Sequence, residues 1–197
     1  MPPRKVQFVQ GHYYHIYNRG AGRQILFRED RNYQYLLKLL KECTTEENVS
    51  VISYCLMSNH YHWCLRQDGE QPVGNVPTRV WGSYTRAYNN AYGRTGTLFE
   101  GRFKAILVDS DGYLRHLCRY IHANPVTAGF ATAPELWPYS NYLEWIEARN
   151  GTLVDRMLVK QLFPSVQSYR DYVLAYLTGH GQMPQGLLDY LRRLENG

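Results

Sequence analysis

The sequence predicts an α+β protein in which helices pack on an antiparallel sheet, an architecture of ferredoxin-like type. Segments with strand and helix patterns follow one another as strand, helix, strand, strand, helix, strand, helix. This order does not fit a doubly wound parallel sheet. The chain has 197 residues, 44% of them hydrophobic and 20% charged, so it can bury a core as one domain, or as one domain with an extension.

The first part of the chain supplies three strands and one helix. Residues 13–19 alternate in character and are expected to form a strand that ends at a turn over residues 20–23. Asp30 is expected to cap a helix whose apolar residues have helical spacing. Strands are expected over residues 49–57 and, after a turn, from His60 onward, because β-branched and aromatic residues dominate there without Gly or Pro.

The second part begins with a loop over residues 68–77, which holds two Gly and two Pro. Thr78 is expected to cap a helix that runs to about Tyr92. Residues 104–108 then form a short apolar strand. This strand completes the four that the predicted sheet needs.

The last helix of the predicted fold spans residues 112–123, with cap candidates at residues 109–111. Asn124 precedes Pro125, which disfavours helical geometry, so the helix should end close to Asn124. Beyond this point the pattern weakens. Short helices are expected over residues 169–177 and 187–194, on either side of a hinge at 179–186.

No segment has the roughly 20 apolar residues needed to span a bilayer, and the N-terminus leads into no signal-peptide core, so we expect a cytoplasmic protein. The four cysteines include no Cys-x-x-Cys pair, and we expect them to be reduced and structural. Cys64 shares a strand face with His62, but a structural zinc site needs further closely spaced ligands that the sequence does not offer.

The net charge of +5 comes mostly from arginine, with 17 Arg against 5 Lys. The guanidinium group suits phosphate and stacks on bases. The chain also has 18 tyrosines, and basic charge interleaved with aromatic rings favours single-stranded or locally melted nucleic acid as a partner. The alternative is a soluble protein that is merely basic. The densest basic segment, residues 79–104, carries five positive side chains and one negative side chain.

Two histidines mark the third strand. Because strand side chains alternate between faces, His60 and His62 point to one face, and Tyr61 and Trp63 point to the other. Two imidazoles about 7 Å apart on one face can bind a single metal ion. The alternative is that both histidines simply line a polar sheet face.

On the helix over residues 112–123, Tyr120 and Asn124 fall on one flank, one turn apart. Two imidazoles and an amide oxygen could hold a divalent ion and leave positions open for a phosphate and water. The alternative is a tyrosine that only packs. The apolar face is formed by Leu114, Leu117, Cys118 and Ile121, and the opposite side carries Arg115, Arg119 and His122.

Four short motifs occur in a specific order along the chain and together resemble REP-associated tyrosine transposases, a branch of the single-tyrosine HUH transposase and nuclease family. The resemblance covers residues 13–142. Ser58 stands where the family usually has proline, and Trp63 where it usually has leucine, and neither change removes a ligand or the nucleophile. The motifs are Tyr14-His15-Ile16-Tyr17-Asn18-Arg19-Gly20, Met57-Ser58-Asn59-His60-Tyr61-His62, Gly96-Thr97-Leu98-Phe99-Glu100-Gly101-Arg102-Phe103 and Arg119-Tyr120-Ile121-His122-Ala123-Asn124-Pro125-Val126.

This resemblance implies a metal-dependent enzyme that cleaves and rejoins single-stranded DNA at hairpin-forming palindromic elements of REP type. Tyr120 would attack the scissile phosphate and form a 5′-phosphotyrosine link. His60, His62 and Asn124 would hold Mg²⁺ or Mn²⁺, and manganese should serve at least as well because two of the ligands are nitrogen.

The resemblance also implies a transposase domain over residues 1–142, a helical extension of unknown role over 143–197, a nucleoid-associated location, and a monomer or homodimer. One alternative is a non-cleaving DNA-hairpin-binding protein of the same fold. The other is a structural protein whose histidines and Tyr120 merely pack. The basic residues expected to contact DNA are Arg19, Arg23, Arg79, Arg86, Arg94, Arg102, Lys104, Arg115 and Arg119.

Overall fold

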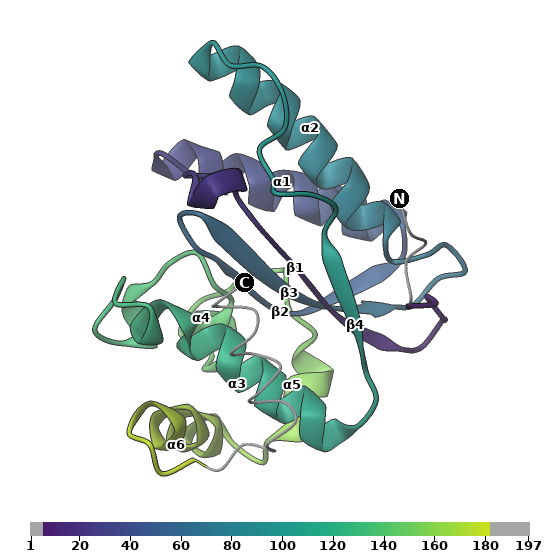
Figure 1. Ribbon diagram of the computed structural model, residues 1–197. Helices are drawn as coiled ribbons and strands as arrows, with labels where there is room; N and C mark the ends of the chain where they lie inside the picture. The colour runs from purple at the N-terminus through teal and green to yellow at the C-terminus, as the bar shows by residue number, and fades with distance from the viewer. Residues whose placement is uncertain (1–5, 182–197) are drawn as a thin grey trace.

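The computed structural model describes residues 6–181 and contains a four-stranded sheet with the strand order β2-β3-β1-β4 (Figure 1). Every neighbouring pair in this sheet is antiparallel, and the helices pack on its faces. The predicted α+β, ferredoxin-like fold class is therefore confirmed. The strands are β1 (Tyr13–Arg19), β2 (Val49–Leu56), β3 (His60–Gln67) and β4 (Lys104–Val108).

The central strands β1 and β3 decide which side chains reach each face of the sheet. In their antiparallel register Tyr17 lies opposite His62, and His15 lies opposite Cys64. Because side chains alternate, these four residues share one face. The opposite face of β3 carries Tyr61, Trp63 and Leu65, which are fully buried.

Helices α1 (Asp30–Glu46) and α2 (Asn75–Tyr92) cover that opposite face of the sheet (Figure 1). The indole of Trp81 on α2 stacks on the indole of Trp63, with ring centroids 5.5 Å apart. This aromatic contact ties the helical layer to β3 and leaves the histidine face of the strand on the other side.

The starts of both helices differ slightly from the sequence prediction. Glu29, rather than Asp30, caps α1, in a capping box with Asn32. Helix α2 begins at Asn75, so Thr78 lies in its first turn and its hydroxyl donates to the carbonyl of Gly74 at 2.8 Å. The first turn also contains a proline, which a helix tolerates there because its missing N–H has no intrahelical partner in any case.

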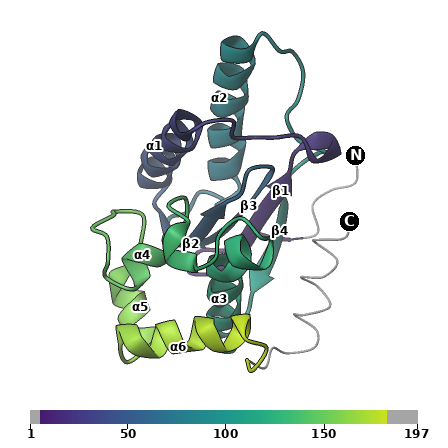
Figure 2. The ribbon, with the colours of Figure 1, turned by 90° about the vertical axis from the view of Figure 1, so that its left-hand side faces the viewer.

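Helix α3 (Asp111–Thr127) packs on the histidine face of the sheet, opposite α1 and α2 (Figures 1 and 2). Ser110 caps it, as predicted, by accepting from the backbone N–H of Tyr113 at 3.3 Å. The prediction that the helix ends near Asn124 is wrong, because α3 continues through Pro125. The proline removes only one intrahelical donor, and it lies close to the helix end in a buried segment, so packing outweighs the lost bond.

Helices α4 (Tyr142–Trp145), α5 (Arg156–Leu162) and α6 (Val166–Leu177) follow, and the short 3₁₀ turns are η1 (Ala21–Arg23) and η2 (Pro134–Leu136). Helix α6 covers the side of α3 that faces away from the sheet (Figure 2). Tyr169 and Val173 of α6 belong to the same buried cluster as Leu117 of α3 and Ile52 of β2. The proposed domain boundary after residue 142 stays a prediction.

The predicted helix over residues 169–177 corresponds to α6, which begins three residues earlier because Ser165 caps it. No sequence pattern indicated α4 and α5. The predicted helix over 187–194, and the hinge from 182 onward, lie outside the described residues. All four cysteines are buried and free of disulfide bonds. Within the described residues, no helix has the length and apolar character needed to cross a bilayer.

Candidate active site

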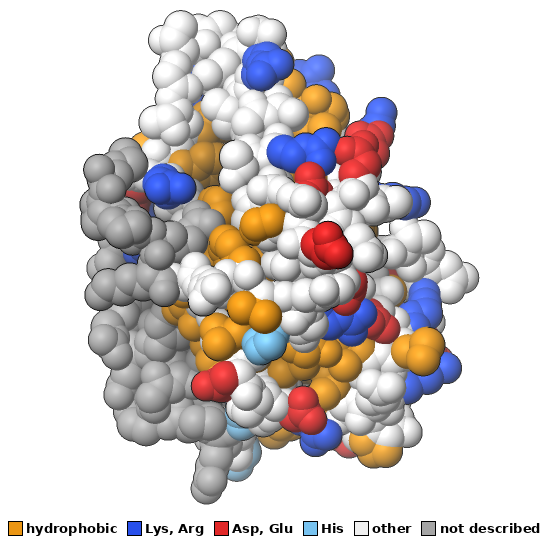
Figure 3. All heavy atoms as spheres, turned by 90° about the vertical axis from the view of Figure 1, so that its right-hand side faces the viewer, with side chains coloured by type: hydrophobic (Ala, Val, Ile, Leu, Met, Phe, Trp, Pro, Cys, Tyr) orange, Lys and Arg blue, Asp and Glu red, His pale blue; other side chains and the backbone are white. Residues whose placement is uncertain are grey.

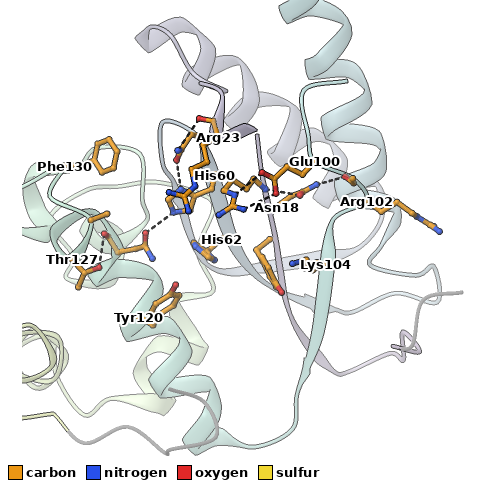
Figure 4. Close-up of a pocket in the computed structure, with 16 residues that line it drawn as sticks. Asn18, Arg23, His60, His62, Glu100, Arg102, Lys104, Tyr120, Thr127 and Phe130 are labelled. Carbon is orange, nitrogen blue, oxygen red and sulfur yellow. Dashed lines mark hydrogen bonds and ion pairs between the residues drawn. The ribbon is translucent and has the colours of Figure 1, made fainter. Parts of the chain in front are cut away.

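A cleft of about 540 Å³ opens between the histidine face of the sheet and α3 (Figure 4). His60 and His62 come from β3, Tyr120 and Asn124 come from α3, and all four line the cleft. Residues about sixty positions apart in the chain therefore meet because the strand and the helix pack face to face. The sequence predicted this set, and the fold brings it together.

The aromatic rings in the cleft make edge-to-face contacts. The imidazole centroids of His60 and His62 are 5.3 Å apart, at an interplanar angle of 81°. The centroids of His62 and Tyr120 are 5.4 Å apart, at 78°. Tyr120 itself is only 2% exposed, so its phenol lies at the inner end of the cleft.

Two amide side chains flank the imidazole of His60. The amide nitrogen of Asn59 donates to the carbonyl of Arg23 at 3.5 Å, so the amide oxygen of Asn59 faces Nδ1 of His60 at 2.8 Å. Nε2 of His60 lies on the other side of the ring, 3.2 Å from Oδ1 of Asn124. Both ring nitrogens thus face an oxygen, and a neutral imidazole has one proton for the two contacts. The shorter contact favours the proton on Nδ1.

Burial keeps the site histidines neutral. It lowers the pKa of His60, and the charge of Arg19 reinforces this change. The oxygen of Asn124 opposes it, because it would accept a proton from Nε2 of the charged ring. Burial also holds the pKa of His62 well below its usual value, with smaller contributions in the same direction from His15 and His60. A neutral imidazole carries a single N–H and offers one lone pair to a ligand.

These donors fit a divalent cation. With its proton on Nδ1, neutral His60 directs the Nε2 lone pair toward the oxygen of Asn124, and a cation bound by both atoms would stabilise this contact between two lone pairs. Two ligands at right angles around an octahedral ion are about 3 Å apart, because each metal–ligand bond is about 2.1 Å. The measured 3.2 Å matches this spacing. Among the described residues, no three His, Cys, Asp or Glu side chains are placed so that they could together hold a metal ion, so an amide ligand is needed to complete a set of three.

His15 of β1 supports His62 from beneath the cleft. It is fully buried, and its Nε2 lies 3.0 Å from Nδ1 of His62. The two rings are nearly parallel, with centroids 5.2 Å apart. Burial lowers the pKa of His15 to about 3, so this imidazole is neutral too. The pair brings a side chain from β1 into direct contact with the candidate ligand on β3.

Four of the nine basic residues predicted to contact DNA line the cleft, namely Arg19, Arg23, Arg102 and Lys104. Arg19 forms an ion pair with Glu100 at 3.1 Å. Arg102 extends outward from the cleft (Figure 4). On the face drawn in Figure 3, basic side chains alternate with acidic ones and do not form one continuous positive patch.

The other predicted contacts lie elsewhere. Arg79 pairs with both Glu46 and Glu47, each at 2.5 Å, on the far side of the sheet. Arg94 donates to the side-chain oxygen of Gln24 at 2.6 Å. Arg86 and Arg115 are exposed but do not line the cleft.

The sequence predicts that Arg119 and His122 lie on the side of the helix away from the apolar face. The structure corrects what this position implies. That side is buried because α6 covers it. The guanidinium carbon of Arg119 lies 4.2 Å from the ring centroid of Tyr172, and His122 lies 2.5 Å from the hydroxyl of Tyr169. Arg119, 1% exposed, is therefore not a surface contact for DNA.

Sequence reasoning missed three residues at the site: His15, Asn59 and Phe130. Strand alternation could have indicated His15. Residues 15 and 17 point to one face of β1, and in the sheet this is the face to which the histidine pair of β3 points. Asn59 directly precedes His60, and the sequence pattern there indicates only a turn. Phe130 lies just beyond α3, 45% exposed at the mouth of the cleft, and no pattern marked it.

Comparisons with known proteins identify the family of the chain. The family model described as "Transposase IS200 like" matches residues 8–124, more than half of the chain. The protein is thus a DNA-processing enzyme of the transposase class. It belongs to the IS200-like transposase family, which confirms the relationship expected from its motifs.

One solved structure has the same fold. The structure of a REP-associated tyrosine transposase bound to a REP hairpin aligns with a TM-score of 0.65 and 16% identity, over 79% of this chain and 94% of that chain. A candidate transposase from Deinococcus radiodurans R1 aligns at 15% identity and a TM-score of 0.41, over 59% of this chain and 92% of that one. No curated protein sequence matches.

Proposed function

We propose that this transposase cleaves and rejoins single-stranded DNA through a covalent link to Tyr120. The observation that carries the proposal is the meeting of three groups in one cleft: the phenol of Tyr120, the imidazole of His62 at 5.4 Å between centroids, and the contact between His60 and Asn124 at 3.2 Å. A nucleophile beside ligands for a cation is an arrangement that supports phosphoryl transfer through a covalent intermediate.

In the proposed reaction the phenolic oxygen of Tyr120 attacks the scissile phosphorus. A bond forms between this oxygen and phosphorus while the bond from phosphorus to the 3′-oxygen breaks, the phenolic proton is released, and the 3′-oxygen gains a proton. The products are a free 3′-hydroxyl and a 5′-phosphotyrosine. Because the new link is also a phosphodiester, a second 3′-hydroxyl can reverse the step and join strands without ATP.

His60, His62 and Asn124 would hold the metal. A bound Mg²⁺ or Mn²⁺ supplies Lewis-acid polarisation of the phosphate. The side chains contribute the orientation: the short contact with Asn59 favours the proton of His60 on Nδ1, and burial keeps both imidazoles neutral and able to bind a cation.

The DNA substrate is proposed to be a hairpin-forming palindrome of REP type with a single-stranded segment that enters the cleft. The solved transposase of the same fold is bound to a REP hairpin, which supports this choice. Arg23 and Lys104 at the cleft would contact the phosphate backbone, and the exposed ring of Phe130 would stack on a base.

The proposed function also assigns roles to the two parts of the chain. Residues 1–142 form the catalytic domain, and residues 143–197 form an extension that supports it. The enzyme acts in the cytoplasm on nucleoid DNA, as a monomer or a homodimer. The support for an extension that stabilises the domain is the buried cluster that α6 shares with α3.

The test is formation of a covalent adduct. Wild-type protein is mixed with labelled single strands that carry a REP-type hairpin, in the presence of Mn²⁺, and the products are separated under denaturing conditions. We expect a labelled protein band that the variant Tyr120→Phe does not form. An adduct formed by Tyr120→Phe would show that another residue is the nucleophile.

The burial of Tyr120 favours a second candidate, a hairpin-binding protein of the same fold that does not cleave. This candidate predicts tight hairpin binding by the wild type, no adduct with any divalent metal, and no change in DNA-related function in Tyr120→Phe. The adduct experiment therefore separates the two candidates directly.

A further inference from the structure

The hydrogen bond between His15 and His62 joins two neutral imidazoles, and this restricts where its proton can lie. Each neutral ring has one N–H and one lone pair. Nε2 of His15 and Nδ1 of His62 are 3.0 Å apart, so one of them carries the shared proton and the other accepts it. The two arrangements have opposite consequences for the cleft.

In the first arrangement His15 donates, and the proton of His62 must then lie on Nε2. Nε2 is the nitrogen of His62 that does not contact His15. When it is protonated it has no lone pair with which to bind a cation. In the second arrangement His62 donates from Nδ1, and Nε2 keeps its lone pair. Only the second arrangement lets His62 act together with His60, for which the short contact with Asn59 favours a proton on Nδ1 and a lone pair on Nε2.

We propose that His15 is a positioning residue that accepts the Nδ1 proton of His62 and so fixes His62 in the tautomer whose Nε2 can bind the metal. This inference rests on the proposed metal site. Metal-binding histidines usually donate their second nitrogen to a carboxylate, a carbonyl or water, and loss of that partner typically costs 10–100-fold in metal affinity. Here the acceptor is a second, fully buried imidazole.

The strand register makes this contact possible. On β1, His15 lies opposite Cys64 of β3, one position along the shared face from the pair formed by Tyr17 and His62. Tyr17 also stacks near His62, with ring centroids 6.0 Å apart at 26°. His62 is thus held by two neighbouring side chains of β1, one of which supplies a hydrogen bond. A rigid strand pair, not a loop, sets the orientation of the candidate ligand.

The direct test is the tautomer of His62 in the metal-free protein, measured by ¹⁵N NMR of histidine-labelled full-length chain. We expect a protonated Nδ1 and a bare Nε2 on His62. In His15→Leu, which removes the acceptor, we expect the Nε2–H form of His62 to appear. In His15→Gln, whose amide oxygen can reach about the same place, the wild-type tautomer should return.

Metal affinity provides a second, independent measurement. Titration with Mn²⁺ alone, followed by the EPR signal of the free ion, should show affinity about 10–100-fold weaker in His15→Leu than in the wild type, with most of it restored in His15→Gln. His122→Gln is the matched control, because His122 is equally buried but contacts Tyr169 and Asn141 rather than the cleft. Thermal unfolding establishes that each variant is folded.

The outcomes distinguish this inference from the proposed function. A wild-type His62 that carries its proton on Nε2, or a His15→Leu variant that keeps Mn²⁺ affinity within about threefold, would overturn the role of His15. A wild type with the expected tautomer that binds no Mn²⁺ would support the hydrogen-bond assignment and count against the proposed metal site.

Discussion

Nε2 of His60 on β3 and Oδ1 of Asn124 on α3 lie 3.2 Å apart, although the two residues are separated by 64 positions in the chain. The contact crosses the cleft between the sheet and the helix. It depends on α3 continuing past Asn124, because the helical backbone on both sides fixes the direction of the amide. The properties of the site therefore depend on how the helix packs on the sheet.

The first prediction concerns this amide. Replacing Asn124 with Asp supplies a charged oxygen at nearly the same position, and hard divalent cations prefer carboxylate to amide oxygen. We expect Asn124→Asp to bind Mn²⁺ and Mg²⁺ at least several-fold more tightly than the wild type, and Asn124→Leu to bind both more weakly. Titration calorimetry measures the effect. Equal affinities in the three proteins would mean that Asn124 is not a ligand.

The second prediction separates basic residues at the cleft from those elsewhere. Arg23→Ala and Lys104→Ala should each weaken hairpin binding, and each should reduce the slope of log affinity against log salt by about 1, because one phosphate contact is lost. Arg79→Ala should change neither quantity, since its guanidinium already pairs with Glu46 and Glu47. Fluorescence anisotropy at several salt concentrations provides the measurement. A larger loss in Arg79→Ala would place the DNA on the other face of the sheet.

The third prediction tests the ring of Phe130. A base stacked on an aromatic side chain typically contributes about 1–3 kcal/mol, so Phe130→Ala should weaken binding of the single-stranded segment by about 5–150-fold. Phe130→Trp should restore it, because an indole also offers a flat surface. Leu136→Ala is a suitable control, since Leu136 is another exposed apolar residue and does not line the cleft. A loss that the tryptophan variant shares equally with the alanine variant would argue against stacking.

The fourth prediction concerns stability below neutral pH. Burial lowers the pKa of His122 to about 4 in the folded protein, whereas an unfolded histidine titrates near 6.5. The unfolded state therefore binds more protons between these values, and the free energy of unfolding should fall as the pH drops from about 6.5 to 4, by about 3 kcal/mol for this residue alone. The buried His15 acts in the same direction.

Urea unfolding at pH 7 and at pH 5 measures this dependence. His122→Gln removes the titrating group, so its stability should change less between the two pH values than that of the wild type. The comparison is made within each protein, which cancels the cost of the substitution itself. The same pH dependence in both proteins would show that His122 is protonated in the folded state.

Local patterns in the sequence predicted much of the fold and the main residues of the site. The alternation along β3 placed His60 and His62 on one face, and the helical period placed Tyr120 one turn before Asn124. Both features depend only on backbone periodicity. The antiparallel sheet followed from the order of the elements, which needs no knowledge of side-chain contacts.

The errors have one physical cause, which is packing between segments distant in the chain. The helical period places Arg119 and His122 on the side of the helix away from the apolar face, but α6 covers that side. Pro125 lies inside α3 because buried neighbours stabilise the helix across it. The role inferred for His15 depends on a neighbour 47 positions away, which no local pattern can indicate.

Burial of α3 on two sides, against β2 and against α6, has a consequence for the second half of the proposed reaction. If α3 moved so that the phenol of Tyr120 left His60 and His62, the apolar contacts of α3 with β2 and with α6 would both become exposed. The helix should therefore stay in place throughout a reaction cycle. Exchange of partners before resealing would then be carried out by the nucleic acid, whose free 3′ ends must replace one another at a stationary tyrosine. In such an enzyme, turnover would be limited by rearrangement of the substrate and not by motion of the protein.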